Sequence, residues 1–262
     1  MISKAILSLG LLCLLAVLTA PVDASSSNIA KERRWAEQVE DGLLDGDVVW
    51  LDDGNGQEFL GVLTEGDADS GRAVLLVHGI GVHPNWPDVI YPLRAGLLEA
   101  GITSLSIQMP ILANEAESIE YAPLFAEVPG RIDAAITALQ EAGYGSVTLV
   151  AHSMGAAMAV YYQARVPVNR IQSLVIIGMS PGLNGDENID RLRQLQLPVL
   201  DLYGEADLPA VLSSAAQRAA AGEAAASAYR QQRVAAANHF FQGQESALVQ
   251  SVLDWLSAQS SP

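Results

Sequence analysis

Three residues that could carry out carbonyl chemistry occur in a fixed order along the chain. Ser153 lies in the pentapeptide Ala-His-Ser-Met-Gly, residues 151–155, directly after the strand formers of residues 146–150. A serine with small residues two positions before and after it is typical of a tight strand-to-helix turn that exposes a nucleophilic hydroxyl. Asp207 and His239 each follow a later strand-like run. A hydroxyl, an imidazole and a carboxylate are the groups that nucleophilic attack on a carbonyl requires.

A fourth element could supply hydrogen-bond donors for that reaction. The apolar run 73–77 leads directly into His78-Gly79-Ile80-Gly81. An attacked carbonyl develops an oxyanion, which preorganised N–H groups stabilise by about 3 kcal/mol per donor. We expect the backbone N–H groups of Ile80 and Met154 to be this pair. Taken alone, the same segment could be a glycine-rich turn at a strand end, with His78 as a core histidine.

The order of the three residues along the chain narrows the choice of fold. Serine, then acid, then histidine is the order in α/β-hydrolases, and it differs from that of chymotrypsin-type and subtilisin-type proteases. Each partner also follows a predicted strand, where an open parallel sheet gathers its functional loops. From about residue 47 to residue 256 the chain resembles the α/β-hydrolase superfamily. The resemblance implies Ser153 as nucleophile, His239 as general base and acid, and Asp207 as the acid that orients the histidine.

Two details refine this resemblance. Glu205 follows the same strand as Asp207, but the spacing Gly204-x-x-Asp207 matches the superfamily pattern, which favours Asp207. The segments 81–87, 105–110 and 200–205 are similar to an uncharacterised proteobacterial branch of exported α/β-hydrolases, a family of unknown function. The narrower resemblance implies no substrate.

The predicted elements alternate as an α/β fold requires. Two strands around the turn-rich residues 53–56 suggest an antiparallel hairpin, and the later alternation predicts a mostly parallel twisted sheet with helices on both faces. Residues 179–197 are too few to form a large cap domain between two of the strands. The expected strands are 48–51, 59–63, 73–77, 103–107, 146–150, 174–177, 198–203 and a run near 234, and the expected helices are 89–99, 131–141, the elbow helix to about 164, and 215–228.

Composition indicates one domain behind an export signal. The chain has 262 residues, 50% hydrophobic and 17% charged, which predicts a single domain over 47–262 after a lead-in of 25–46. Lys4, an apolar run to residue 18 and small residues at Val22 and Ala24 predict a signal peptide over 1–24. We therefore expect a periplasmic or secreted protein; the alternative is an N-terminal membrane anchor. Cleavage would remove Cys13, the only cysteine.

Charge and histidine spacing limit the expected partners. The formal net charge of −16 argues against nucleic acid and against electrostatic adsorption to anionic lipid. The four histidines lack metal-binding spacing and there is no cysteine cluster, so we expect neither a metal nor another cofactor. A small-molecule substrate is expected, and nothing in the sequence indicates the oligomeric state.

Candidate pocket walls come from two segments. Trp86 follows the oxyanion loop, and Tyr121, Leu124 and Phe125 recur at helix-like spacing; all four could equally be packing residues. Together the residues predict a serine hydrolase that cleaves carboxylic esters through an acyl-enzyme on Ser153. The alternatives are an amidase or an acyltransferase with the same triad, or a non-catalytic envelope binding protein on a hydrolase fold.

Overall fold

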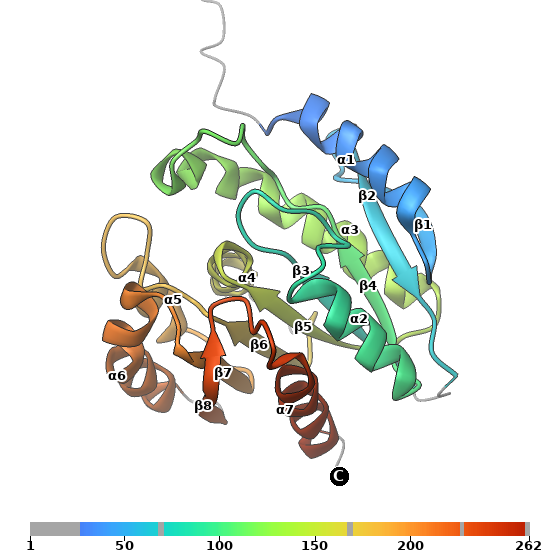
Figure 1. Ribbon diagram of the computed structural model, residues 1–262. Coiled ribbons are helices and arrows are strands. Elements are labelled where there is room, and N and C mark those ends of the chain that lie inside the picture. The colour runs from blue at the N-terminus through green and yellow to red at the C-terminus, as the bar shows by residue number, and fades with distance from the viewer. Residues whose placement is uncertain (1–26, 68–70, 167–169, 226–227, 260–262) are drawn as a thin grey trace, which may run out of the picture.

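The computed structural model describes residues 27–67, 71–166, 170–225 and 228–259 (Figure 1). The predicted signal peptide and its cleavage site lie outside these residues. No helix in the described ranges is long and apolar enough to cross a bilayer.

The chain folds around one eight-stranded sheet with the order β1-β2-β4-β3-β5-β6-β7-β8. β2 pairs antiparallel with both β1 and β4, whereas all other neighbouring strands are parallel. The predicted hairpin and mostly parallel sheet are therefore confirmed. The strands are β1 (Asp47–Asp52), β2 (Glu58–Thr64), β3 (Arg72–Val77), β4 (Thr103–Ile107), β5 (Ser146–His152), β6 (Ser173–Ile177), β7 (Val199–Ala206) and β8 (Tyr229–Asn238).

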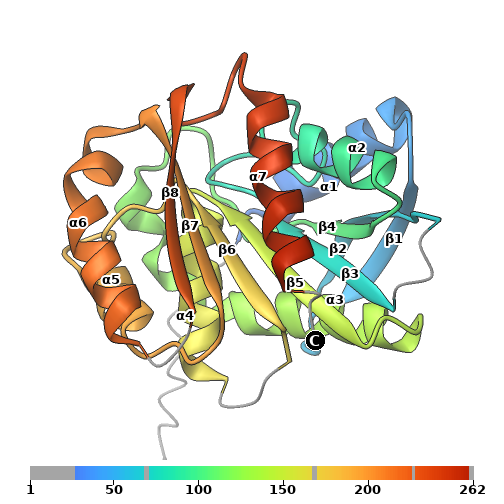
Figure 2. The same ribbon diagram turned by 90° about the horizontal axis from the view of Figure 1, so that it is seen from below.

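Helices cover both faces of the sheet, as predicted (Figure 2). α2 (Ile90–Glu99) and α7 (Glu245–Ala258) lie on one face, and α3 (Val128–Glu141) and α4 (Met154–Arg165) lie on the other. The connection between β6 and β7 contains only the short α5 (Glu187–Leu192), so there is no large cap domain there.

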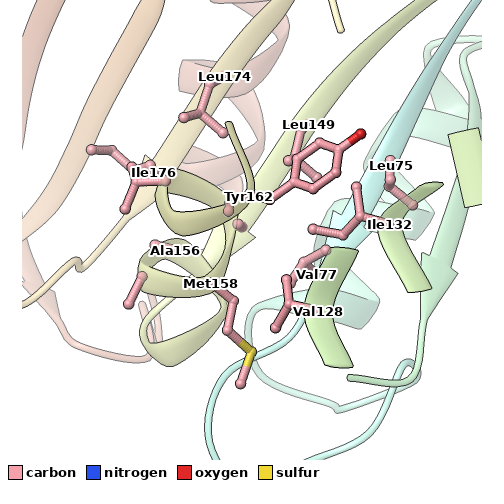
Figure 3. Close-up of a cluster of buried hydrophobic side chains, with 14 of the residues drawn as sticks. Leu75, Val77, Val128, Ile132, Leu149, Ala156, Met158, Tyr162, Leu174 and Ile176 are labelled. Carbon is pink, nitrogen blue, oxygen red and sulfur yellow. The ribbon is translucent and has the colours of Figure 1, made fainter. Parts of the chain in front are cut away.

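The core beneath α3 and α4 explains why the central strands are apolar throughout. Leu75, Leu149 and Leu174 project from three neighbouring strands against Ile132 and Tyr162 of the two helices (Figure 3). All five are fully buried. A parallel sheet covered on both faces needs such apolar runs, and its rigidity fixes the loops at the carboxyl ends of the strands.

Two helices differ from the sequence-based expectation. The predicted helix 215–228 is α6 (Pro209–Ala224), which begins earlier because a proline is well tolerated in the first helical turn. Its Arg218 is fully buried and pairs with Asp201 of β7 at 2.8 Å. The helix-like spacing of Tyr121, Leu124 and Phe125 corresponds to a 3₁₀ helix, η1 (Ser118–Glu127), rather than to an α-helix.

The predicted lead-in contains α1 (Ile29–Gly42), which packs on the sheet. The Asn28 side chain accepts a hydrogen bond from the Lys31 N–H and caps the helix. Ala36 and Val39 are buried against Leu60 and Val62 of β2. α1 thus covers the antiparallel end of the sheet.

Candidate active site

Ser153 occupies a strained turn between β5 and α4. Its φ of 57° and ψ of −120° lie outside the regions that a residue with a side chain normally adopts. A Cβ on Gly155 would lie 2.3 Å from the carbonyl oxygen of His78, so only glycine lets α4 start this close to the end of β3. The turn leaves the serine partly exposed at the carboxyl edge of the sheet.

Ser153, His239 and Asp207 form one hydrogen-bonded row. His239 Nε2 lies 2.9 Å from Ser153 Oγ, and His239 Nδ1 lies 2.6 Å from Asp207 Oδ1. Because a carboxylate only accepts, Nδ1 carries the proton in neutral His239 and Nε2 is free to accept from the serine hydroxyl. The structure therefore brings together the three residues that the sequence singled out, in the geometry of a nucleophile, a base and an orienting acid.

Asp207 is held as a buried carboxylate. Its side chain also accepts hydrogen bonds from the N–H groups of Leu208, at 2.7 Å, and Gly204, at 3.1 Å. Burial acts to raise the pKa of Asp207, but the hydrogen bonds from these groups and from His239 outweigh it and hold the pKa below its ordinary value. A Cβ on Gly178, whose φ is 60°, would lie 3.0 Å from the His239 ring, so glycine makes room for the histidine.

Glu205, the competing acid, points elsewhere. Its carboxylate pairs with Arg233 and accepts a hydrogen bond from the Ala236 N–H at 3.0 Å, on the exposed surface. Those interactions lower its pKa. Only Asp207 of the two acids reaches His239.

His78 supports the loop that carries Ile80. The buried His78 Nε2 accepts a hydrogen bond from the Met109 N–H at 2.9 Å, so Nδ1 carries the proton and donates to the Gly79 carbonyl at 2.8 Å. Burial lowers the pKa of His78 to about 3, which keeps the ring neutral. Within the described part of the chain, the N–H groups of Ile80 and Met154 donate to no protein atom.

His152, the residue before the serine, supports the histidine side of the site. Its Nε2 lies 3.0 Å from the backbone oxygen of His239 and therefore donates, and the two rings lie 4.8 Å apart. Burial, followed by the charge of His239, lowers the pKa of His152 to about 3. The His152 side chain therefore packs directly on His239, the hydrogen-bond partner of Ser153.

The predicted pocket walls are only partly placed near open space. Tyr121 and Leu124 are corrected to core residues, at 1% and 0% exposure, because the helix-like stripe faces the hydrophobic core. Phe125 borders a cavity of about 200 Å³ between η1, α4 and the segment after β6, and it packs edge-on against Tyr161. Trp86 is half-buried, packs against His83 and donates to Asp88 at 3.2 Å.

Several supporting residues were missed by the sequence analysis. Gly178 and Gln108 have no motif of their own, and their importance depends on a ring or a loop that another segment brings close. Gln108 did fall within the segment 105–110 that carried the narrower resemblance, which was the one signal available. In the described residues there is no cluster of three His, Cys, Asp or Glu side chains that could hold a metal ion.

The sheet, the strained serine turn and the order of the elements define an α/β-hydrolase fold. The chain belongs to the family described as "Protein of unknown function (DUF3530)", whose model matches residues 18–129 and 122–258. No curated protein sequence matches the chain.

Solved structures with the same fold include several enzymes. A dienelactone hydrolase from Anabaena variabilis ATCC 29413 is 24% identical, with a TM-score of 0.66 over 82% of this chain and 97% of that chain. The esterase Pf2001 of Pyrococcus furiosus is 12% identical, with a TM-score of 0.68 over 84% and 95% of the two chains. Est1E from Butyrivibrio proteoclasticus is 12% identical, with a TM-score of 0.64 over 82% and 99%. At these identities the likeness establishes the fold.

Proposed function

We propose that the protein is a serine hydrolase that cleaves carboxylic esters of small molecules through an acyl-enzyme on Ser153. The observation that carries the proposal is the continuous row of Ser153 Oγ, His239 and Asp207, at 2.9 and 2.6 Å. Hydrolase and esterase names among proteins of the same fold support the same class of reaction.

In the proposed reaction, Ser153 Oγ attacks the ester carbonyl while His239 Nε2 takes its proton. Asp207 stabilises the imidazolium that forms, and the N–H groups of Ile80 and Met154 receive the oxyanion. His239 then protonates the departing alcohol, which leaves the acyl group on Ser153. A water molecule, deprotonated by the same histidine, attacks the acyl-enzyme and releases the acid.

The surroundings of the serine suit an ester with an apolar part. Phe240 directly follows His239, is 41% exposed, and its ring lies 5.1 Å from the imidazole. Leu208 directly follows Asp207 and is 47% exposed. Because only α5 lies between β6 and β7, we expect soluble short-chain esters to be preferred over long-chain ones.

Labelling with a fluorophosphonate, together with hydrolysis of p-nitrophenyl esters of increasing acyl length, tests the proposal. Ser153→Ala should remove labelling and lower turnover by about 10⁴-fold or more, because no other group replaces the nucleophile. The folded state should survive, which circular dichroism and thermal unfolding check. Equal turnover in wild type and Ser153→Ala would refute the proposal.

A further inference from the structure

The segment 108–112, which continues from β4, is bound on its inner side by the histidine that holds the oxyanion loop. His78 Nε2 accepts from the Met109 N–H at 2.9 Å and lies 3.0 Å from the Gln108 side-chain nitrogen. The same Gln108 nitrogen donates to the Met109 carbonyl at 2.8 Å. The position of His78 therefore depends on where this segment lies.

The outer side of the same segment is bound by α3 and by the start of α1. Arg131 of α3 donates to the Gln108 carbonyl at 3.0 Å. The Asn28 N–H donates to the Ile111 carbonyl at 2.6 Å, and Lys31 Nζ donates to the Leu112 carbonyl at 2.8 Å. Three successive contacts thus fix the segment from outside.

Arg131 is itself oriented by the amino-terminal residues. Its guanidinium, fully buried, donates to both carboxylate oxygens of Glu32, at 3.0 and 3.2 Å, and to Ser27 Oγ at 3.2 Å. Ser27 in turn donates to Glu127 through its hydroxyl at 2.7 Å and its N–H at 2.9 Å. A buried ion pair of this kind often adds little stability compared with apolar residues, so its geometry is the more informative property.

The geometry of one peptide unit links these contacts to the reaction. The Gly79 carbonyl and the Ile80 N–H belong to the same planar trans peptide, so they point in opposite directions. By donating to the Gly79 carbonyl at 2.8 Å, His78 sets the direction in which the Ile80 N–H points. A Cβ on Gly79 would lie 3.1 Å from Ser153 Cβ, so this peptide lies directly beside the nucleophile.

We propose that residues 27–32 are a positioning element for the oxyanion hole. Through Arg131 and the segment 108–112 they fix His78, and His78 aims the Ile80 N–H at the developing oxyanion. This inference rests on the proposed serine hydrolase function. It assigns a role in the reaction to the amino-terminal lead-in, which contributes no side chain to the triad.

The decisive variant replaces the ion pair by apolar residues of similar size. Glu32→Leu combined with Arg131→Met removes both buried charges, so folding should be retained. Glu32→Gln alone leaves the buried Arg131 with only the partly exposed Glu127, at 3.5 Å, as a counter-charge. The double variant should lose about tenfold or more in kcat for p-nitrophenyl acetate, with KM within about twofold, because misplacement of one donor affects the transition state. If the ion pair only stabilises the fold, the folded double variant should instead have the kcat of the wild type.

Phenylboronic acid supplies an independent readout. It adds to the serine as a tetrahedral boronate, whose oxygen occupies the oxyanion position, so its inhibition constant should rise about tenfold in the double variant. The matched control is the equally buried pair of Asp201 and Arg218, replaced by leucine and methionine. In the described part of the chain, the other hydrogen bonds of that pair go to Val211, Ser214, Tyr229 and Gln231 and none goes to the segment 108–112, so kcat should stay within about twofold.

Lys31→Met keeps the Glu32–Arg131 ion pair and removes the contacts of the ammonium with the Leu112 carbonyl and with the Trp35 ring on its own helix, so it should fold even if the double variant does not. We expect about a threefold lower kcat and a similar rise in the boronate constant. Folded variants that keep wild-type kcat and boronate affinity overturn the inference. A wild-type chain that neither hydrolyses the ester nor binds phenylboronic acid instead refutes the proposed function.

Discussion

The two sides of Ser153 are built in different ways. On one side, Asp207 and His239 reach the serine through side chains that hydrogen-bond to one another directly. On the other side, the proposed functional group is the backbone N–H of Ile80, and His78 holds it by donating to the Gly79 carbonyl of the same peptide unit. The first arrangement depends on which residues are present, and the second depends on how a loop is held.

Each side has one buried neutral histidine, and the two use opposite ring nitrogens as donors. His78 donates through Nδ1 to the Gly79 carbonyl, whereas His152 donates through Nε2 to the His239 carbonyl. Both rings are kept neutral by burial, which lowers each pKa to about 3. The same residue type therefore positions the proposed backbone donor on one side and the proposed general base, His239, on the other.

The largest expected effect comes from the side-chain half of the site. Asp207→Asn should lower kcat about 10² to 10⁴-fold, because an amide nitrogen facing His239 Nδ1 favours the tautomer that cannot accept from Ser153. Steady-state hydrolysis of a short-chain ester measures the loss.

Glu205→Gln is the matched control for this prediction. Glu205 follows the same strand but is exposed and pairs with Arg233, so its loss should change kcat by less than about twofold. A glutamine variant more damaging than Asp207→Asn would show that the acid is misassigned.

Low pH should lower the free energy of unfolding through both supporting histidines, His78 and His152. The pKa of His78 and His152 falls from 6.5 in an unfolded chain to about 3 in the folded protein. Below pH 6.5 the unfolded chain therefore binds protons that the folded chain does not, so stability is greatest above pH 6.5 and is lost as the pH falls toward 3. The loss at pH 5 should be about 2 kcal/mol per histidine.

Urea unfolding at pH 7 and pH 5 measures the contribution of His78 to this loss when wild type is compared with His78→Asn. The variant should be less stable than wild type at pH 7 but should lose about 2 kcal/mol less on going to pH 5. Equal losses in the two proteins would mean that His78 is protonated in the folded state.

A smaller expected effect on kcat distinguishes His78 from His152, because the two rings donate through different nitrogens. An asparagine amide can replace a donor at Nδ1 and a glutamine amide a donor at Nε2, because the number of bonds from Cα matches. At position 78, Asn should therefore retain about tenfold more kcat than Gln, since it can still donate to the Gly79 carbonyl.

Position 152 is the control, because the order of the two amides should reverse there. His152→Gln can still donate to the His239 carbonyl, so it should retain about threefold more kcat than His152→Asn. The difference is smaller because Asp207 also holds His239. The same order at both positions would contradict the assigned tautomers.

The sequence predicted the side-chain half of the site far better than the backbone half. Ser153, Asp207 and His239 carry distinctive functional groups at strand ends, and a parallel sheet brings strand ends together. The expected oxyanion donors could only be inferred from the turn at residues 78–81, because a backbone N–H leaves no residue-type signal. The residues that orient this N–H lie in other segments of the chain, and no local sequence pattern marks them.

The helix-like spacing of Tyr121 and Leu124 indicates a covered face but not a pocket. An apolar stripe reports that one face is covered, but it does not say whether a core or a ligand covers it. α1 was expected only as a lead-in because its contacts, from Glu32 to Arg131 and from Lys31 to Leu112, are between residues far apart in sequence. Such pairings depend on the folded topology and cannot be read from local pattern.

The sequence separation of these contacts has a consequence for folding. Ser27 and Glu127 are 100 positions apart, and Glu32 and Arg131 are 99 apart. Contacts of this separation carry a large loop-closure entropy and form late compared with local turns, such as that around Ser153. A chain that has not closed this loop contains the nucleophile but no fixed oxyanion donor, so on the proposed mechanism the serine becomes reactive only as folding is completed.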